Sequence, residues 1–149
     1  MKTIPLNDTS RLSQIIISEA MDDISNIIKS GRWLLGDYTT QFANYFASYI
    51  GSEFCIPVAN GTDALVIALQ CLSKSGRNQV ITVANAGGYT STACYLSGHT
   101  PVYIDVHEDS MLMDISLIDD LLNENTSCVV ATHLYGRTEK WTPMVGHIN

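Results

Sequence analysis

The stretch VANGTDALVIALQ, residues 58–70, places Asn60-Gly61-Thr62-Asp63 directly before an apolar run. This turn has two interpretations. In the first it is purely structural: Asn and Gly tolerate positive φ, and Thr62 or Asp63 caps the helix that follows. In the second, the unpaired N–H groups and the positive dipole end of that helix bind an anion, usually a phosphate. Helix starts of this kind are common, so the turn alone favours the structural interpretation.

Composition and charge restrict the classes of partner. The 149 residues are 46% hydrophobic, which is enough for one packed domain, and their net charge is −7 with eight Lys and Arg. Nucleic-acid binding requires clustered positive charge, so we expect no nucleic-acid partner. No apolar segment approaches the roughly 20 residues of a membrane helix, and no signal-peptide core follows the first residues. The sequence therefore predicts a cytoplasmic protein without a membrane partner.

The cysteines and histidines are scattered along the chain. The cysteines stand singly inside apolar segments, with neither a C-x-x-C pair nor metal-ligand spacing. We expect them to be buried, reduced thiols and expect no metal site, because the histidines also lack two-ligand spacing on one helix face. The residues concerned are Cys55, Cys71, Cys94, Cys128, His99, His107, His133 and His147.

Two helices come first, followed by alternating strands and helices. Apolar residues at three- and four-residue steps predict a helix over residues 11–30 that ends at Gly31. A second helix is predicted from the cap Asp37 to Gly51. Beyond it the pattern predicts strands at 54–58, 79–83, 101–105 and 128–133, with helices at 62–73, 89–96 and 115–123, the last capped by Asp114.

Such alternation predicts a mostly parallel sheet covered on both faces. In these sheets ligands bind at the carboxyl ends of the strands. Four places meet that description: the turn before residue 64, the segment Asn85–Tyr89, Asp105, and the segment His133–Gly136 with its Tyr135. Each has an ordinary alternative as a loop, a turn cap or an edge residue, but their convergence on one rim predicts a binding site.

Six segments in order carry a family resemblance. They are IPLND (4–8), SGRWLLGDYTTQFANYFASYIG (30–51), VANGTDAL (58–65), VITVAN (80–85), GHTPVYIDV (98–106) and HLYG (133–136). Together they resemble the N-terminal part of the DegT/DnrJ/EryC1/StrS family, which comprises pyridoxal-phosphate-dependent sugar aminotransferases. The resemblance implies an α/β fold, the large domain of the aspartate-aminotransferase-like fold (PLP fold type I), with a mostly parallel sheet that is truncated. It covers residues 1–136 and leaves 137–149 as an atypical tail that we expect to be poorly ordered.

The resemblance also implies a cofactor site. Gly61, Thr62 and Asp63 correspond to the turn whose backbone amides hold the 5′-phosphate of pyridoxal phosphate. In relatives an aromatic ring from the next loop lies against the cofactor ring. Gly87 stands where many relatives have Phe or Tyr, so Tyr89 is our choice for the stacking residue.

The implied reaction is amino transfer from glutamate to a nucleotide-linked keto-sugar, in polysaccharide or deoxysugar biosynthesis, by a homodimer. The partners would thus be a small-molecule sugar nucleotide and an amino-acid donor. Trp33 lies in a segment that resembles the border of the sugar-nucleotide site and is a candidate substrate-binding residue. Packing between the first two helices is an equally good explanation for that tryptophan.

The catalytic groups of the family have no counterpart here. Family members need a lysine that holds the cofactor covalently and moves protons, and an acidic residue beside the pyridine nitrogen. None of Lys2, Lys29, Lys74 and Lys140 stands at the family position, and the family's motifs do not follow Gly136. We assign no catalytic residue and expect an inactive truncation that binds the cofactor weakly or not at all. Two alternatives stay open: a sugar dehydratase of the same family, or a non-catalytic fragment.

Overall fold

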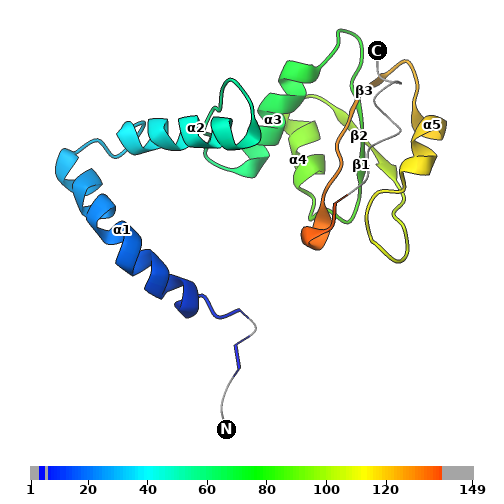
Figure 1. Ribbon diagram of the computed structural model, residues 1–149. Coiled ribbons are helices and arrows are strands. Elements are labelled where there is room, and N and C mark those ends of the chain that lie inside the picture. The colour runs from blue at the N-terminus through cyan, green and yellow to red at the C-terminus, as the bar shows by residue number, and fades with distance from the viewer. Residues whose placement is uncertain (1–3, 6, 139–149) are drawn as a thin grey trace. The chain divides into compact units, whose positions relative to one another are not determined.

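The computed structural model describes residues 4–5 and 7–138 (Figure 1). The chain divides into two compact units, with the boundary between Pro57 and Val58. We call them the N-terminal unit and the C-terminal unit. Most of the tail predicted at 137–149 lies outside the described residues, as do Lys2, Lys140 and His147.

Two helices make up the regular structure of the N-terminal unit. Helix α1 covers Ser10–Ser30 and helix α2 covers Asp37–Ile50, each ending at the predicted glycine. The predicted cap Asp37 is wrong by one residue: Gly36 is the N-cap, and Asp37 is the first helical residue. The Asp37 carboxylate instead pairs with Arg32, Oδ1 to Nη1 at 3.3 Å.

Among the described residues of the N-terminal unit, Ala47 is the one buried apolar side chain. Both helices are amphipathic, yet their apolar faces are open to solvent within the unit. These faces consist of Leu12, Ile15, Ile16, Ile17, Met21, Ile24 and Ile28 on α1, and Phe42, Tyr45, Phe46, Tyr49 and Ile50 on α2. The unit therefore has apolar surface but hardly any core.

The C-terminal unit contains a three-stranded sheet in the order β2-β1-β3. Strand β1, Gln79–Val83, pairs in parallel with β2, Thr100–Ile104, and with β3, Thr126–Val129. The pairing confirms the predicted parallel sheet. The helices are α3, Gly61–Leu72, α4, Tyr89–Leu96, and the short α5, Ile118–Leu121, with 3₁₀ turns η1, Ile115–Leu117, and η2, Leu134–Gly136.

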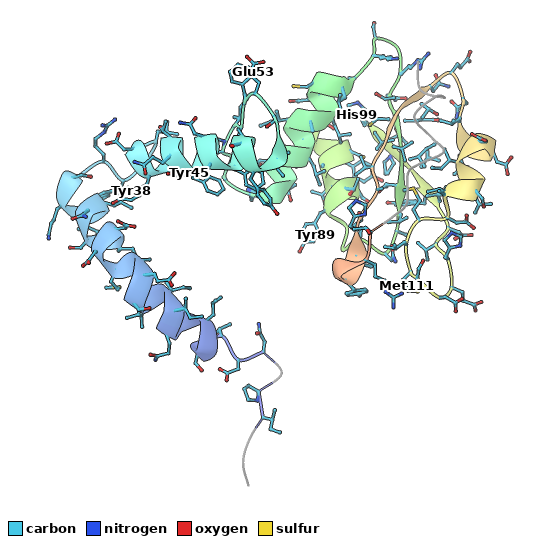
Figure 2. The ribbon with its side chains drawn as sticks, viewed as in Figure 1. Tyr38, Tyr45, Glu53, Tyr89, His99 and Met111 are labelled. Carbon is cyan, nitrogen blue, oxygen red and sulfur yellow. The ribbon has the colours of Figure 1, made fainter. Side chains whose placement is uncertain are left out.

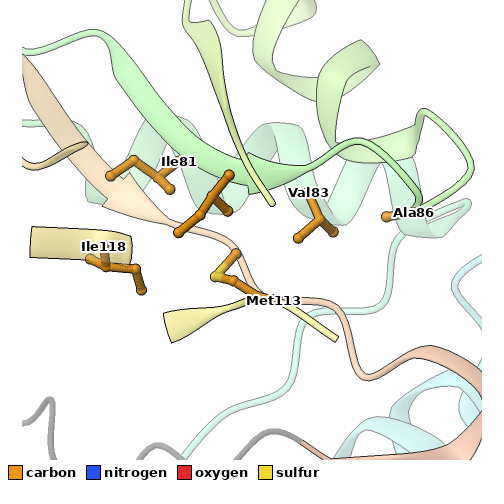
Figure 3. Close-up of a cluster of buried hydrophobic side chains, with 6 residues drawn as sticks. Ile81, Val83, Ala86, Met113 and Ile118 are labelled. Carbon is orange, nitrogen blue, oxygen red and sulfur yellow. The ribbon is translucent and has the colours of Figure 1, made fainter. Parts of the chain in front are cut away.

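Helices cover both faces of this sheet (Figure 1). On one face Leu69 of α3 and Ala93 and Cys94 of α4 pack with Val80 of β1. On the other, Ile81 and Val83 of β1 pack with Ile104, Met113 and Ile118 (Figure 3). The burial of β1 residues on both faces explains why the adjacent residues Val80 and Ile81 are both apolar.

Three predicted elements differ from the structure by more than one residue. Residues 54–58 form no strand: Phe54 and Ile56 are 74% and 80% exposed, and Pro57 has no N–H to donate to a ladder. The strand predicted at 128–133 begins at Thr126 and ends at Val129. The helix predicted at 115–123 is a 3₁₀ turn followed by one α-helical turn, although Asp114 caps its start as predicted, accepting from the Ser116 N–H at 3.0 Å.

The cysteines are all free thiols, as predicted, but they are not all buried. Cys94 is fully buried, Cys55 and Cys128 are half-buried, and Cys71 is exposed because it lies on the outer side of α3. Burial, and secondarily the nearby Cys128, raises the pKa of the Cys94 thiol, and burial raises the pKa of Cys128. No helix in the described part of the chain is both long and apolar enough to cross a membrane.

Candidate cofactor site

A cavity of about 600 Å³ opens in the C-terminal unit where α3, α4 and the segment after β3 begin. Its size lies within the range of about 300–1,000 Å³ that is typical of small-molecule sites. Three of the four places selected from the sequence contribute to its wall. The lining residues are Asn60, Gly61, Thr62, Leu65, Ala86, Tyr89, Thr90, Val130, Ala131, Thr132 and His133.

The N-terminus of α3 forms one side of this cavity. Asn60, and not Thr62 or Asp63, is the N-cap: its Oδ1 accepts from the Asp63 N–H at 2.9 Å. Its Nδ2 donates to Asp63 Oδ2, also at 2.9 Å. Within the described residues no hydrogen bond uses the N–H groups of Gly61 and Thr62. The turn thus has both predicted properties, a structural cap and unpaired donors at the positive end of a helix.

Asp63 differs from its two neighbours. It does not line the cavity, and the cap already occupies its N–H. Its carboxylate is held beside Asn60 at the start of the helix, where negative charge is favourable. A role for Asp63 in holding a ligand phosphate stays a prediction, whereas Gly61 and Thr62 have donors to offer.

Tyr89 is the first residue of α4 and lies on the cavity wall, although 65% of it is exposed (Figure 2). The two residues before it, Gly87 and Gly88, have φ of 68° and 78°. Among the described residues its hydroxyl makes no hydrogen bond, so the ring is free to present a face to a ligand. Ala86 and Thr90, both buried, complete this side of the wall.

The remaining predicted residues lie elsewhere. Asp105 contributes to a separate cavity of about 270 Å³ beside Asp120, so the expected convergence of all four places is wrong for this residue. Asn85 donates from Nδ2 to the Met111 carbonyl at 2.9 Å and does not line the cofactor-sized cavity. Tyr135 is 84% exposed with a left-handed φ of 56° and also lies outside the lining.

Sequence reasoning did not select Thr90 and Thr132, although both line the cavity. The signal was available, because Thr90 directly follows and Thr132 directly precedes a segment that was selected for its position after a strand. It was missed because threonine is common at such places and carries no charge or unusual spacing.

Trp33 belongs to the N-terminal unit, where it lines a smaller cavity of about 240 Å³ between the end of α1 and the start of α2. It is 72% exposed, and its Nε1–H points to the Ile28 carbonyl at 3.5 Å. An indole exposed to this degree is not a packed link between the two helices. A role of Trp33 in substrate binding stays a prediction.

Neither described lysine is among the residues that line the cofactor-sized cavity. Lys29 is in the last turn of α1, and Lys74 is exposed after α3. In the described part of the chain, no group of three or more His, Cys, Asp or Glu side chains could hold a metal ion. The polar groups on this wall are therefore backbone N–H groups, hydroxyls, the Asn60 amide and an imidazole.

Comparison with known proteins agrees on one family. The profile of the DegT/DnrJ/EryC1/StrS aminotransferase family matches residues 14–144. The dTDP-3-amino-3,4,6-trideoxy-alpha-D-glucose transaminase of Micromonospora megalomicea is 31% identical over 127 residues, which are 85% of this chain and 34% of that protein. The 3-oxo-glucose-6-phosphate:glutamate aminotransferase of Bacillus subtilis is 28% identical over 130 residues, 85% of this chain and 30% of that protein.

Solved structures match in the same partial way. S. venezuelae DesV superimposes with a TM-score of 0.88 at 27% identity, over 95% of this chain and 38% of that one. The chain therefore spans about a third of the length of the relatives it matches.

Proposed function

Because this chain belongs to the DegT/DnrJ/EryC1/StrS aminotransferase family, whose members use pyridoxal phosphate, we propose that its C-terminal unit forms the phosphate-binding side of the cofactor site. The reaction served is amino transfer from glutamate to a nucleotide-linked keto-sugar. The names of the two curated relatives, a dTDP-sugar transaminase and a glutamate-dependent aminotransferase, support both halves of that reaction.

One observation carries the proposal: Gly61 and Thr62, whose N–H groups make no hydrogen bond within the described residues, line the same cavity as Tyr89. A dianionic phosphate at this helix end accepts charge-assisted hydrogen bonds and needs no basic patch, which suits a chain of net charge −7. When bound, the cofactor supplies the electron sink for amino-group transfer. Gly61 and Thr62 would fix its phosphate, and Tyr89 would fix the plane of its ring.

We further propose that these 149 residues alone do not transaminate. Neither Lys29 nor Lys74 lines the cavity, so no described amine is placed to bind the cofactor covalently or to move a proton. Affinity for the cofactor rests on phosphate donors and one ring, and must offset the entropy of immobilising the ligand. We therefore expect weak binding.

The exposed faces of the N-terminal unit suggest the remaining partners. Trp33 is our candidate for the face that holds the sugar or base of the substrate, because its indole is open and borders a cavity. The apolar faces of α1 and α2 are candidates for the contact of a homodimer, since they are covered by nothing within their own unit.

The phosphate site is tested by Gly61→Pro. Proline is well tolerated at the first position of a helix, and here it removes one of the two free N–H donors. The probe is pyridoxamine 5′-phosphate, which does not react with surface lysines, titrated against the 149-residue chain by NMR. Loss of one hydrogen bond to a charged group should weaken binding roughly tenfold or more.

The matched control is Asp37→Pro, which places proline at the first position of α2, outside the cavity, and should leave the affinity unchanged. Pyridoxamine without its phosphate should bind far more weakly to the unmodified chain. Equal affinity for the two probes, or an unaltered affinity in Gly61→Pro, would contradict the site.

Inactivity is tested by assaying glutamate and a keto-sugar nucleotide with pyridoxal phosphate and the purified chain. We expect no turnover above a protein-free control that contains the cofactor. Turnover above that control, together with borohydride fixation of the cofactor to one lysine, would show that a lysine of this chain performs the chemistry after all.

A further inference from the structure

We propose that Gly87 is a positioning residue for the Tyr89 ring: the missing side chain at position 87 leaves the space in which that ring lies at the cavity wall. The inference rests on the proposed function, because the ring matters there as the group that stacks on the cofactor. It goes beyond that function by assigning a task to a residue that contacts no ligand.

The geometry around Gly87 carries the proposal. A Cβ built on Gly87 would lie 2.9 Å from Cε2 and 3.2 Å from Cδ2 of Tyr89. Carbon atoms without a bond between them prefer separations of about 3.5–4.0 Å, so even a methyl group at this position would displace the ring. The three nearest atoms within 4 Å of that Cβ all belong to the Tyr89 ring, so the ring would give way before the backbone does.

The neighbouring Gly88 separates two reasons for having glycine here. Both residues have left-handed φ, 68° and 78°, a conformation that costs any other residue energy. A Cβ on Gly88, however, would meet no atom within 4 Å. The left-handed φ alone explains glycine at position 88. At position 87 glycine meets two requirements, the left-handed φ and space for the Tyr89 ring.

Little else holds the ring in place. Tyr89 is 65% exposed, belongs to neither buried apolar cluster, and its hydroxyl makes no hydrogen bond within the described residues. The ring nevertheless lines the same cavity as Gly61 and Thr62 of α3. The empty space at position 87 is therefore what allows the ring to lie where it does at the cavity wall.

The test compares Gly87→Ala with Gly88→Ala in the 149-residue chain, since both positions have a left-handed φ but only a side chain at 87 meets the ring. The ring signals of Tyr89 are assigned in NMR spectra by their loss in Tyr89→Phe. We expect Gly87→Ala to shift these signals and Gly88→Ala to leave them nearly unchanged. Equal shifts in the two variants, or none in Gly87→Ala, would overturn the proposal.

If Gly87→Ala does not fold, the double variant Gly87→Ala, Tyr89→Ala decides the matter. Removing the ring should restore folding to the level of Gly88→Ala, and persistent unfolding would contradict the proposal. A second readout is the affinity for pyridoxamine 5′-phosphate, which should fall roughly two- to tenfold more in Gly87→Ala than in Gly88→Ala, the range that aromatic stacking provides.

A third variant tests whether an aromatic ring placed at position 87 restores the affinity for pyridoxamine 5′-phosphate. The variant Gly87→Tyr, Tyr89→Ala should regain affinity relative to Tyr89→Ala alone, and failure to regain any would count against the shared location of the two side chains. If the unmodified chain does not bind the probe, the proposed function fails, while the NMR comparison still decides whether Gly87 positions the ring.

Discussion

At the scale of single residues, His99 shows how one polar side chain can be buried without loss. It is 7% exposed and lies past the C-terminal end of α4 (Figure 2). Its Nε2 lies 2.5 Å from Ser73 Oγ and its Nδ1 2.8 Å from Ser97 Oγ, and these serines are the C-caps of α3 and α4. One imidazole therefore joins the C-terminal ends of two helices whose N-terminal residues line the candidate site.

We expect His99→Ala to lower the free energy of unfolding by roughly 2–3 kcal/mol, because it removes two hydrogen bonds and leaves a small cavity. The matched control is His107→Ala. His107 is half exposed, 3.6 Å from Asp114 Oδ1, and such a pair contributes little, so we expect a change below about 0.5 kcal/mol. Chemical denaturation measures the free energy of unfolding of both variants. A similar decrease in the two would show that the hydrogen bonds of His99 to the two serines add little stability.

At the scale of elements, the sequence predicts helices and strands well where the hydrophobic periodicity agrees with the positions of glycines and capping residues. The limits of β1 and α4 match the prediction, and α3 begins one residue earlier than expected. The strand at 54–58 failed because a short apolar run does not reveal whether a neighbouring strand exists to pair with it. Sheet pairing is a property of distant segments, and Pro57 was the only local sign against it.

The candidate site was predictable to a similar degree. The rule that ligands bind at the carboxyl ends of parallel strands selected Tyr89 and His133, which line the cavity. Gly61 lines it too, although the strand expected before it at 54–58 does not form. The rule failed for Asp105, because the chain after β2 turns toward η1 and α5 instead. The choice of Asn60 as cap depends on which side chain reaches the Asp63 N–H, and sequence alone leaves three polar residues to choose from.

At the scale of the whole molecule, the core is unevenly divided between the two units. Apart from Ala47, the buried apolar side chains of the described residues belong to the C-terminal unit, and both clusters lie entirely within it. We therefore expect residues 58–149 alone to melt cooperatively at nearly the temperature of the full chain. Residues 1–57 should instead cause the full chain to self-associate, through the exposed apolar faces of α1 and α2.

Calorimetry and sedimentation at micromolar concentration test both expectations, with Ile81→Ala as the control. This substitution should lower the free energy of unfolding by roughly 2–5 kcal/mol in both the full chain and residues 58–149, since Ile81 is fully buried in the C-terminal unit. A shorter chain without a cooperative transition would show that the N-terminal unit is needed for folding. A full chain that sediments as a monomer would contradict the role of the helices in association.

The order β2-β1-β3 leaves each outer strand with one side unpaired by any described strand, and the two edges are not equivalent. Strand β2 contains Pro101, a residue that removes a donor and is typical of protected edges. Strand β3, with the sequence TSCV, has neither proline nor charge. An extended segment would thus add more readily beside β3 than beside β2, which makes β3 the edge where the sheet is open to growth and the place where misassembly of the chain would begin.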